Sequence, residues 1–303
     1  MKNGSLWYDD RGVPIQAHGG CIIEHDGIWY WYGENKDIDN LPGLTMVPFV
    51  GISCYSSVDL VNWHFEGNVL QANKDDPNNP MHVSKICERP KVIYNEKTRS
   101  FVLWMHLDNR GYSFARAGVA IARSPAGPFD FLGVRHVNRT DCRDMTVFRD
   151  TDGTAYLLHS GDWNKTMYIS QLNGNFTDFT GFYTKAMIDQ EREAPAILYH
   201  DGLYYMVTSG CTGWVPNSAL YGISPNLASG ARWKLIDNPC EGPDYRKTFK
   251  GKSAYIFFAG GLPYLMLDHW KPQNLRESGY SILRIYMDNG TMKIPWQDAF
   301  KGI

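Results

Sequence analysis

The chain has 303 residues, 43% of them hydrophobic and 14% aromatic, which is enough to bury a large core. A formal net charge of -2 and a pI near 6.5 provide no basic surface to attract nucleic acid or an anionic membrane. No apolar run is long enough to span a membrane, and the N-terminal stretch MKNGSLWYDD lacks the apolar core of a signal peptide. We therefore expect a cytoplasmic protein whose six widely spaced cysteines are reduced.

Five segments share one form, in which a short apolar strand is followed by a turn and an aromatic strand. They are CIIEHDGIWYWYGE, PKVIYNEKTRSFVLWMH, MTVFRDTDGTAYLLHS, PAILYHDGLYYMVTSG and SAYIFFAGGLPYLMLD. Three residues after each turn position stands an aromatic residue: Tyr30, Phe101, Tyr156, Tyr205 and Tyr264. Asp-Gly pairs occupy three of the turns, and such pairs favour hairpins because glycine accepts the positive φ that these turns need.

The spacing of the five hairpins indicates the fold. The turn positions are residues 27, 98, 153, 202 and 261, so each interval has room for about four strands. No long amphipathic helix pattern interrupts them. The sequence therefore predicts an all-β chain, a five-bladed β-propeller that forms a single domain over residues 1–303. Trp7 and Trp296 stand near the two ends and are expected at the seam where the ring closes.

Polar residues at the inner-strand starts are the candidates for chemistry, because propeller blades present these ends around the axis. Three carboxylates hold equivalent positions there: Glu88, Asp144 and Glu193. Each has an arginine neighbour, so a purely structural ring of ion pairs is one interpretation. Several like charges around one axis are costly, however, and such an arrangement favours a polar substrate.

Paired carboxylates are the tools of glycoside hydrolysis. One of them must hold a proton for the leaving oxygen, and a neighbouring negative charge or an apolar wall raises its pKa. Glu193, which is followed by Ala-Pro and an apolar strand, suits the role of this acid. Asp144 suits the neighbour that raises the pKa of Glu193.

The chain resembles glycoside hydrolase family 43, and within it the exo-β-1,3-galactanase group. The resemblance rests on IQAHGG, YWYGE, SSVDLVNW, ERPKVIYN, the Arg-Asp of CRDMTVFRDTDG, REAPAI, the TGW at 212–214 and the Asp, Trp and Asn-Leu of DHWKPQNL. It implies a five-bladed propeller, an inverting mechanism and an exo-acting pocket, with Glu193 as the acid and Asp144 as the modulator of its pKa. It also implies sugar contacts from Glu34, Glu88, Tyr112, Asp162, Asn164, Thr212 and Trp214.

Two features depart from the family pattern. The usual base, an Asp of the first blade, is not evident, and the region contains Gln16 and His18, which we include among the candidate substrate-binding residues. The galactanase group has a Gln in a Ser-Gln-Ser-Thr motif of the fifth blade. Here the matching stretch is GKSA, so Lys252 replaces that Gln. A protonated lysine has no hydrogen-bond acceptor.

Three interpretations of Lys252 follow. Positive neighbours and burial could make it a neutral base, it could bind an anionic substituent, or it could pair with Glu88 or Glu34 and leave one of these as the base. We favour the third, which makes Glu88 the third catalytic residue.

The sequence thus predicts an inverting, exo-acting glycoside hydrolase that cleaves galactose- or arabinose-containing oligosaccharides. We expect no cofactor, and we assign no metal, although His18 or His269 could contact a calcium ion in the channel. One alternative is a carbohydrate-binding propeller that has lost its base, which Lys252 would favour. Another is a protein-interaction propeller, which would not need inward carboxylates.

Overall fold

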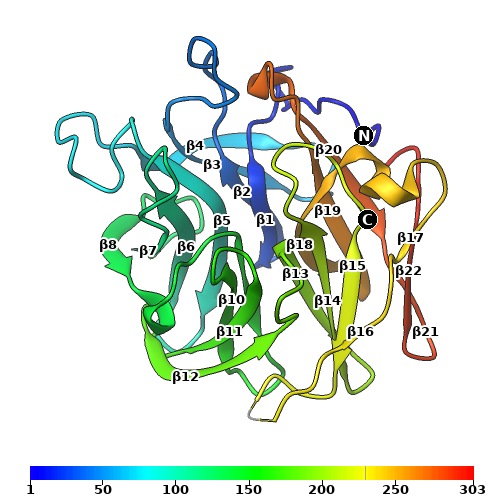
Figure 1. Ribbon diagram of the computed structural model, residues 1–303. Helices are drawn as coiled ribbons and strands as arrows, with labels where there is room; N and C mark the ends of the chain where they lie inside the picture. Colours follow the sequence, from blue (N-terminus) through cyan, green and yellow to red (C-terminus); the bar gives the residue numbers. More distant parts are fainter. Residues whose placement is uncertain (229) are drawn as a thin grey trace.

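Each of the five predicted hairpins forms the first two strands of its own antiparallel sheet. The computed structural model describes every residue except residue 229, and its strands build a β-propeller (Figure 1). The five marker aromatics lie near the start of the second strand in five separate sheets, as predicted. Asp26-Gly27 and Asp201-Gly202 are two-residue turns in which both residues have positive φ.

Four sheets have four strands each, in chain order. They are β1 (His18–His25), β2 (Ile28–Glu34), β3 (Gly51–Ser57) and β4 (His64–Gln71); β5 (Ile86–Asn95), β6 (Ser100–Asp108), β7 (Arg116–Ala122) and β8 (Asp130–Arg135); β9 (Met145–Arg149), β10 (Ala155–Gly161), β11 (Thr166–Leu172) and β12 (Phe179–Ala186); and β13 (Arg192–His200), β14 (Leu203–Gly210), β15 (Leu220–Ser224) and β16 (Lys234–Leu235). A fifth sheet has three strands, β18 (Lys252–Ala259), β19 (Leu262–His269) and β20 (Gly279–Arg284).

The predicted count of five blades needs correction, because the described residues form six sheets. The sixth joins β17 (Cys240–Glu241), β21 (Tyr286–Asp288) and β22 (Thr291–Pro295), and its β17–β22 pair is parallel. A two-residue turn at Asn289-Gly290, both with positive φ, connects β21 to β22. Asn-Gly is a strong hairpin signal. This hairpin was not predicted because Lys293, not an aromatic residue, stands three positions after the turn.

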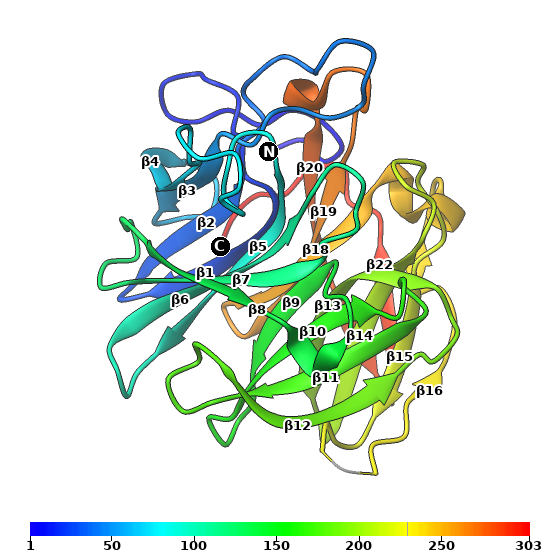
Figure 2. The ribbon, with the colours of Figure 1, turned by 60° about the vertical axis from the view of Figure 1, so that its left-hand side comes forward.

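The hydrophobic core is divided among the gaps between neighbouring sheets. Strand β1 contacts β5 and β18, β5 contacts β9, and β13 contacts β9 and β18, so these five strands close a ring (Figure 2). One buried cluster, for example, joins Trp31 of β2 to Ile282 of β20. The sixth sheet contributes Met292 and Ile294 to the cluster between the β13 and β18 sheets. Apolar burial between sheets therefore holds the inner strands together.

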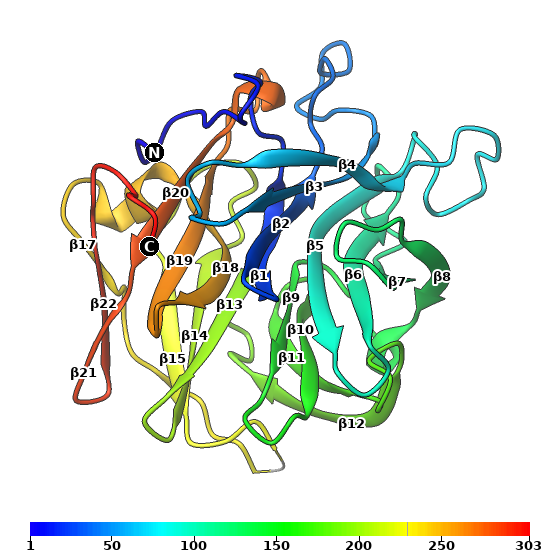
Figure 3. The ribbon, with the colours of Figure 1, turned by 180° about the vertical axis from the view of Figure 1, so that it is seen from behind.

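The two ends of the chain lie side by side, as Figure 3 shows. Trp7 packs against Trp31 and Tyr280, with ring centroids 5.9 and 5.7 Å apart, so it sits in the seam as predicted. Trp296 instead packs against Phe249 at 5.2 Å, in the cluster that the sixth sheet shares.

The helical segments among the described residues are short 3-10 turns. They are η1 (Val137–Arg139), η2 (Tyr245–Lys250) and η3 (Leu275–Glu277). In the part of the chain that the structure describes, no helix has the length and apolar character needed to cross a membrane.

Candidate active site

A cavity of about 360 Å³ opens where the inner strands begin. It is lined by Glu34, Thr45, Met46, Glu88, Arg89, His106, Tyr112, Arg143, Asp144, Asn164, Glu193, Gly213, Trp214, Lys252 and Trp270. Its size is within the range of about 300–1,000 Å³ that is usual for small-molecule sites.

A register shift occurs near the start of four inner strands. It changes the direction in which the polar side chains at these positions point. The shifts fall between Glu88 and Lys91 in β5, between Glu193 and Ala196 in β13, and at the corresponding places in β1 and β18. In the first two, Arg89 and Ala194 take left-handed backbone conformations, with φ of 54° and 52°. Bulges of this kind bend a strand and redirect its side chains, and they are common beside active sites.

Glu193 faces an anion and a cation at once. Burial raises the pKa of its carboxyl, the charge of Asp144 raises it further, and Lys252 and Arg89 lower it, with a net upward shift. The Lys252 ammonium, which is almost fully buried, forms an ion pair with Glu193. This contact corrects our expectation that Lys252 pairs with Glu88 or Glu34. Glu193 lies at the bulge in β13 and contacts Lys252 of β18, and no local signal in the sequence marks this bulge.

Asp144 is held from two sides. Its Oδ2 atom accepts a 3.1 Å hydrogen bond from the backbone amide of Ala194 and lies 3.0 Å from the Arg89 guanidinium. The amide belongs to the residue next to Glu193, so Asp144 and Glu193 are fixed relative to each other.

Glu34 has little freedom to take part in proton transfer. One of its oxygens accepts the Arg89 backbone amide at 2.9 Å, and the other pairs with Lys36 at 2.6 Å. Its side chain is only 4% exposed. Gly19 has a φ of +57°, and a Cβ at this position would lie 2.3 Å from a Glu34 oxygen. Glycine is therefore needed here for both conformation and space.

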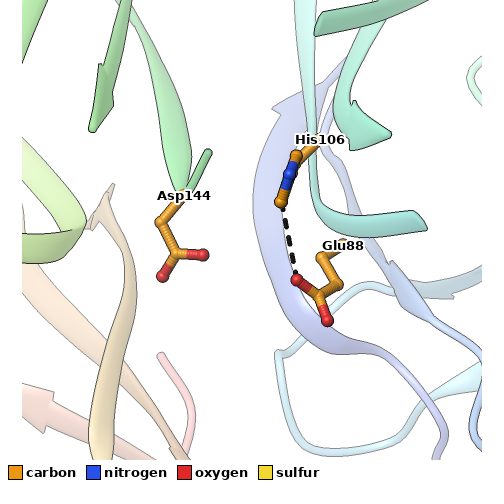
Figure 4. A group of neighbouring side chains, drawn as sticks. All are labelled: Glu88, His106 and Asp144. Carbon is orange, nitrogen blue, oxygen red and sulfur yellow. Dashed lines mark ion pairs between the residues drawn. The ribbon is translucent and has the colours of Figure 1, made fainter. Parts of the chain in front are cut away.

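Glu88 is the more accessible of these two glutamates, with a side chain 20% exposed. Tyr112 donates its hydroxyl to one Glu88 oxygen at 3.0 Å, and the other oxygen lies 3.5 Å from His106 Nδ1, the ion pair drawn in Figure 4. Burial alone would raise the pKa of Glu88, but His106, Lys36 and Tyr112 outweigh it, and the net shift is downward. Although burial opposes it, the hydrogen bond to Asp108 and the nearby carboxylate of Glu88 raise the pKa of His106 to about 9. Glu88 is therefore a carboxylate kept ionised by a charged imidazole.

The structure brings together eight of the twelve predicted site residues. These are Glu34, Glu88, Tyr112, Asp144, Asn164, Glu193, Trp214 and Lys252. The other four do not line the cavity. His18 bonds Asp268 and Tyr280, and Gln16 donates to the Arg276 carbonyl, so both are buried in packing.

The remaining two residues hold loops. Asp162 accepts hydrogen bonds from Tyr168 at 2.8 Å and from Thr140 at 3.1 Å. Thr212 donates to the Val215 carbonyl at 2.5 Å. Asn164 and Trp214, which do line the cavity, each lie two residues further along the chain.

The sequence analysis missed several lining residues. His106 lies in the second strand of its sheet and Trp270 directly follows one, while Thr45 and Met46 come from a loop. None of these residues stands at the start of an inner strand, where the polar candidates were expected. His106 is an ionisable residue inside the apolar run FVLWMHLD, and this contrast could have marked it as a candidate site residue. Nothing local marks Thr45, whose hydroxyl accepts the Trp214 indole N–H at 3.1 Å across 169 positions of sequence.

Glu88, His106 and Asp144 offer one metal-ligating atom each, all within 4.8 Å of one another (Figure 4). Arg89 already pairs with an Asp144 oxygen, and a cation here would have to displace a proton from His106, whose pKa is raised to about 9. His18, which the sequence analysis considered for calcium, has both ring nitrogens engaged.

Known proteins resemble this one over most of its length. Residues 43–259 match Glycosyl hydrolases family 43. A solved family 43 β-1,3-galactosidase with galactodeoxynojirimycin aligns at a TM-score of 0.91 and 35% identity, over 99% of both chains. The exo-β-1,3-galactanase of Phanerochaete chrysosporium with galactose aligns at 0.87 and 32% identity, over 97% of this chain and 66% of that one.

A curated arabinoxylan arabinofuranohydrolase of Paenibacillus polymyxa is 26% identical over 285 residues, which is 85% of this chain and 41% of that protein. The chain therefore spans about two fifths of this relative. The propeller fold, the cavity and these relatives together place the chain among the glycoside hydrolases. The chain belongs to glycosyl hydrolases family 43, which confirms the resemblance found in its motifs.

Gly19→Ala should disable the site by displacing Glu34. The matched control is Gly27→Ala, which has a similar left-handed φ of +78° but no atom within 4 Å of the added Cβ. Both variants carry the backbone cost of about 1–2 kcal/mol. We expect Gly19→Ala to lose more free energy of unfolding in urea than the control, and to lose most of its hydrolytic rate as well. Equal stabilities and rates would show that the close packing against Glu34 does not matter.

Proposed function

We propose that this single propeller domain is an inverting, exo-acting glycoside hydrolase that releases terminal sugars from galactose- or arabinose-containing oligosaccharides. The observation that carries the proposal is the position of Glu193, a cavity-lining carboxyl whose pKa is raised by burial and by Asp144. A raised pKa lets a carboxylic acid keep its proton until it is transferred to a leaving oxygen.

Glu193 acts as the general acid in this proposal. Its proton passes to the glycosidic oxygen as the bond to the anomeric carbon breaks, and the charge on that carbon rises. Asp144 keeps the pKa of Glu193 high, and its hydrogen bond from the Ala194 amide keeps the two carboxyls in register. This is the modulator role expected from the resemblance.

Glu88 acts as the general base. It takes one proton from a water molecule whose oxygen attacks the anomeric carbon from the opposite face, which inverts the configuration. A base must be ionised and reachable. Glu88 has a lowered pKa and a partly open side chain, whereas Glu34 is closed in by Arg89 and Lys36.

Lys252 tunes the acid rather than the base. Its ammonium pairs with Glu193 and opposes the effect of Asp144, so the pKa of Glu193 reflects the balance between the two charges. A lysine in contact with the acid does not need to accept a proton from water.

The substrate proposal rests on the cavity walls and on the relatives. Trp214 and Trp270 form one wall, with ring centroids 5.1 Å apart, and flat aromatic faces suit the C–H face of a sugar ring. Two relatives are named for β-1,3-linked galactose and one for arabinofuranose. We place β-1,3-galactobiose first among candidate substrates.

The test is an assay on aryl glycosides of galactose, arabinofuranose, xylose and galactofuranose, together with β-1,3-galactobiose. We expect cleavage of the galactosides, with proton NMR showing the inverted anomer as first product. Glu193→Gln should lower the rate on the disaccharide about 100- to 10,000-fold, because it removes the transferred proton. Glu88→Gln should be similarly damaging, and Lys252→Gln much less so. A retained anomer, or near-normal hydrolysis of the disaccharide by Glu193→Gln, would overturn the mechanism.

The charges around Glu193 also predict opposite changes in the pH profile. Asp144 raises the pKa of Glu193, so Asp144→Asn should lower it and move the alkaline limb of kcat to lower pH. Lys252 lowers the pKa of Glu193, so Lys252→Gln should raise it and move the same limb to higher pH. The measurement is kcat across pH for the three proteins on β-1,3-galactobiose, whose poor leaving group needs the proton of the acid. Shifts in the same direction would contradict the assignment of Glu193 as the acid.

A further inference from the structure

Trp163 is a large aromatic side chain that the fold leaves 69% exposed. It lies in the turn between β10 and β11, where Asp162, Trp163 and Asn164 take left-handed conformations with φ of 52°, 58° and 65°. Such conformations are unfavourable for residues other than glycine and recur at ligand-binding positions when the surroundings enforce them.

The surroundings do enforce this turn. Asp162 is anchored by Tyr168 and Thr140, and the Asn164 carbonyl oxygen of the side chain accepts the Ser160 hydroxyl at 2.7 Å. The Trp163 backbone amide donates to the Asp141 carboxylate at 3.1 Å. The indole is therefore held outward by a turn that is fixed on both sides.

A cation also fixes the indole face. The Arg143 guanidinium lies 4.5 Å from the ring centroid, and Arg143 is itself held by Asp141, which lies 2.5 Å from its Nε. One carboxylate thus positions both the backbone of Trp163 and the cation stacked on its ring. Arg143 and Asn164 line the cavity, so Trp163 stands at its rim between two lining residues.

The rim at Trp163 is on the side of Glu193. The Ser160 hydroxyl oxygen also lies 2.8 Å from the Arg192 carbonyl oxygen, and the Gln190 backbone amide donates to the Lys165 carbonyl at 3.2 Å. These contacts join the turn to the segment that leads into Glu193. A general acid faces the leaving oxygen, so the sugar that departs emerges past this segment.

We propose that Trp163 is the stacking platform for the sugar on the leaving-group side of the cleaved bond. This assignment rests on the function proposed above. The ligand is a neutral hexose or pentose ring, which would lay its C–H face on the free face of the indole while the terminal sugar occupies the cavity. The clamp keeps the ring ready in the free enzyme, which lowers the entropy lost on binding.

The experiment measures kcat/KM of the Trp163→Ala variant and of the wild-type protein on two substrates. β-1,3-Galactotriose has a sugar on the leaving-group side, whereas β-galactosyl fluoride has a single atom there. We expect kcat/KM for the trisaccharide to fall about tenfold, mainly through KM, and kcat/KM for the fluoride to stay unchanged. Trp163→Phe should recover part of the loss, because it restores a flat face.

The matched control is Tyr286→Ala on β21. Tyr286 is also exposed and also stacks with an arginine, Arg284, at 4.7 Å, but Arg284 does not line the cavity, whereas Arg143 does. Tyr286→Ala should leave kcat/KM unchanged for both substrates. If Trp163→Ala lowers kcat/KM equally on both substrates, Trp163 only covers Arg143 and has a structural role. If it leaves kcat/KM for the trisaccharide unchanged, Trp163 does not bind substrate. A wild-type protein that cleaves neither substrate would instead refute the galactosidase activity on which this assignment rests.

Discussion

Arg89 is the link that allows several carboxylates to share one small cavity. Its backbone amide binds Glu34, and its guanidinium reaches both Asp144 and the Ser253 carbonyl. Beneath it, the fully buried Lys91 donates to the carbonyls of Gly19 and Arg89, and burial lowers the pKa of Lys91 to about 8. Like charges this close would repel each other strongly without a cation between them. The left-handed conformation of Arg89 makes the arrangement possible, since it turns the amide and the side chain toward different strands.

The proposed acid, Glu193, and the proposed base, Glu88, differ because their neighbours differ. Glu193 faces an anion and a cation, whereas Glu88 faces a charged imidazole and a hydroxyl donor, so their pKa values move apart. Two carboxyls with separated pKa values are what acid and base catalysis requires in one site. Lys252 fits this division as a counterweight to Asp144. In this chain, the balance of charges on the acid thus includes a lysine where the galactanase group was expected to have a glutamine.

Part of this could be predicted from the sequence. The hairpins were predictable because Asp-Gly turns and alternating aromatics are local signals, and Glu193 and Asp144 were found because they stand at inner-strand starts. The partner of Lys252 was not predictable, since it depends on bulges that no single residue announces. His18 and Gln16 were predicted from their motif as substrate-binding residues, but both are buried and hydrogen-bonded to other parts of the protein. The sixth sheet was missed because its Asn289-Gly290 turn lacks the aromatic on which the count relied.

The claim on which the account depends is that Glu193 holds a proton when the substrate binds. The most direct measurement is a pH titration of its side-chain carboxyl by ¹³C NMR, in protein labelled with [δ-¹³C]glutamate. Absence of the signal in Glu193→Gln identifies the resonance. The account predicts a midpoint above the ordinary glutamate value of 4.5. A midpoint at or below 4.5 would mean that Lys252 and Arg89 outweigh burial and Asp144, and that Glu193 is not the acid.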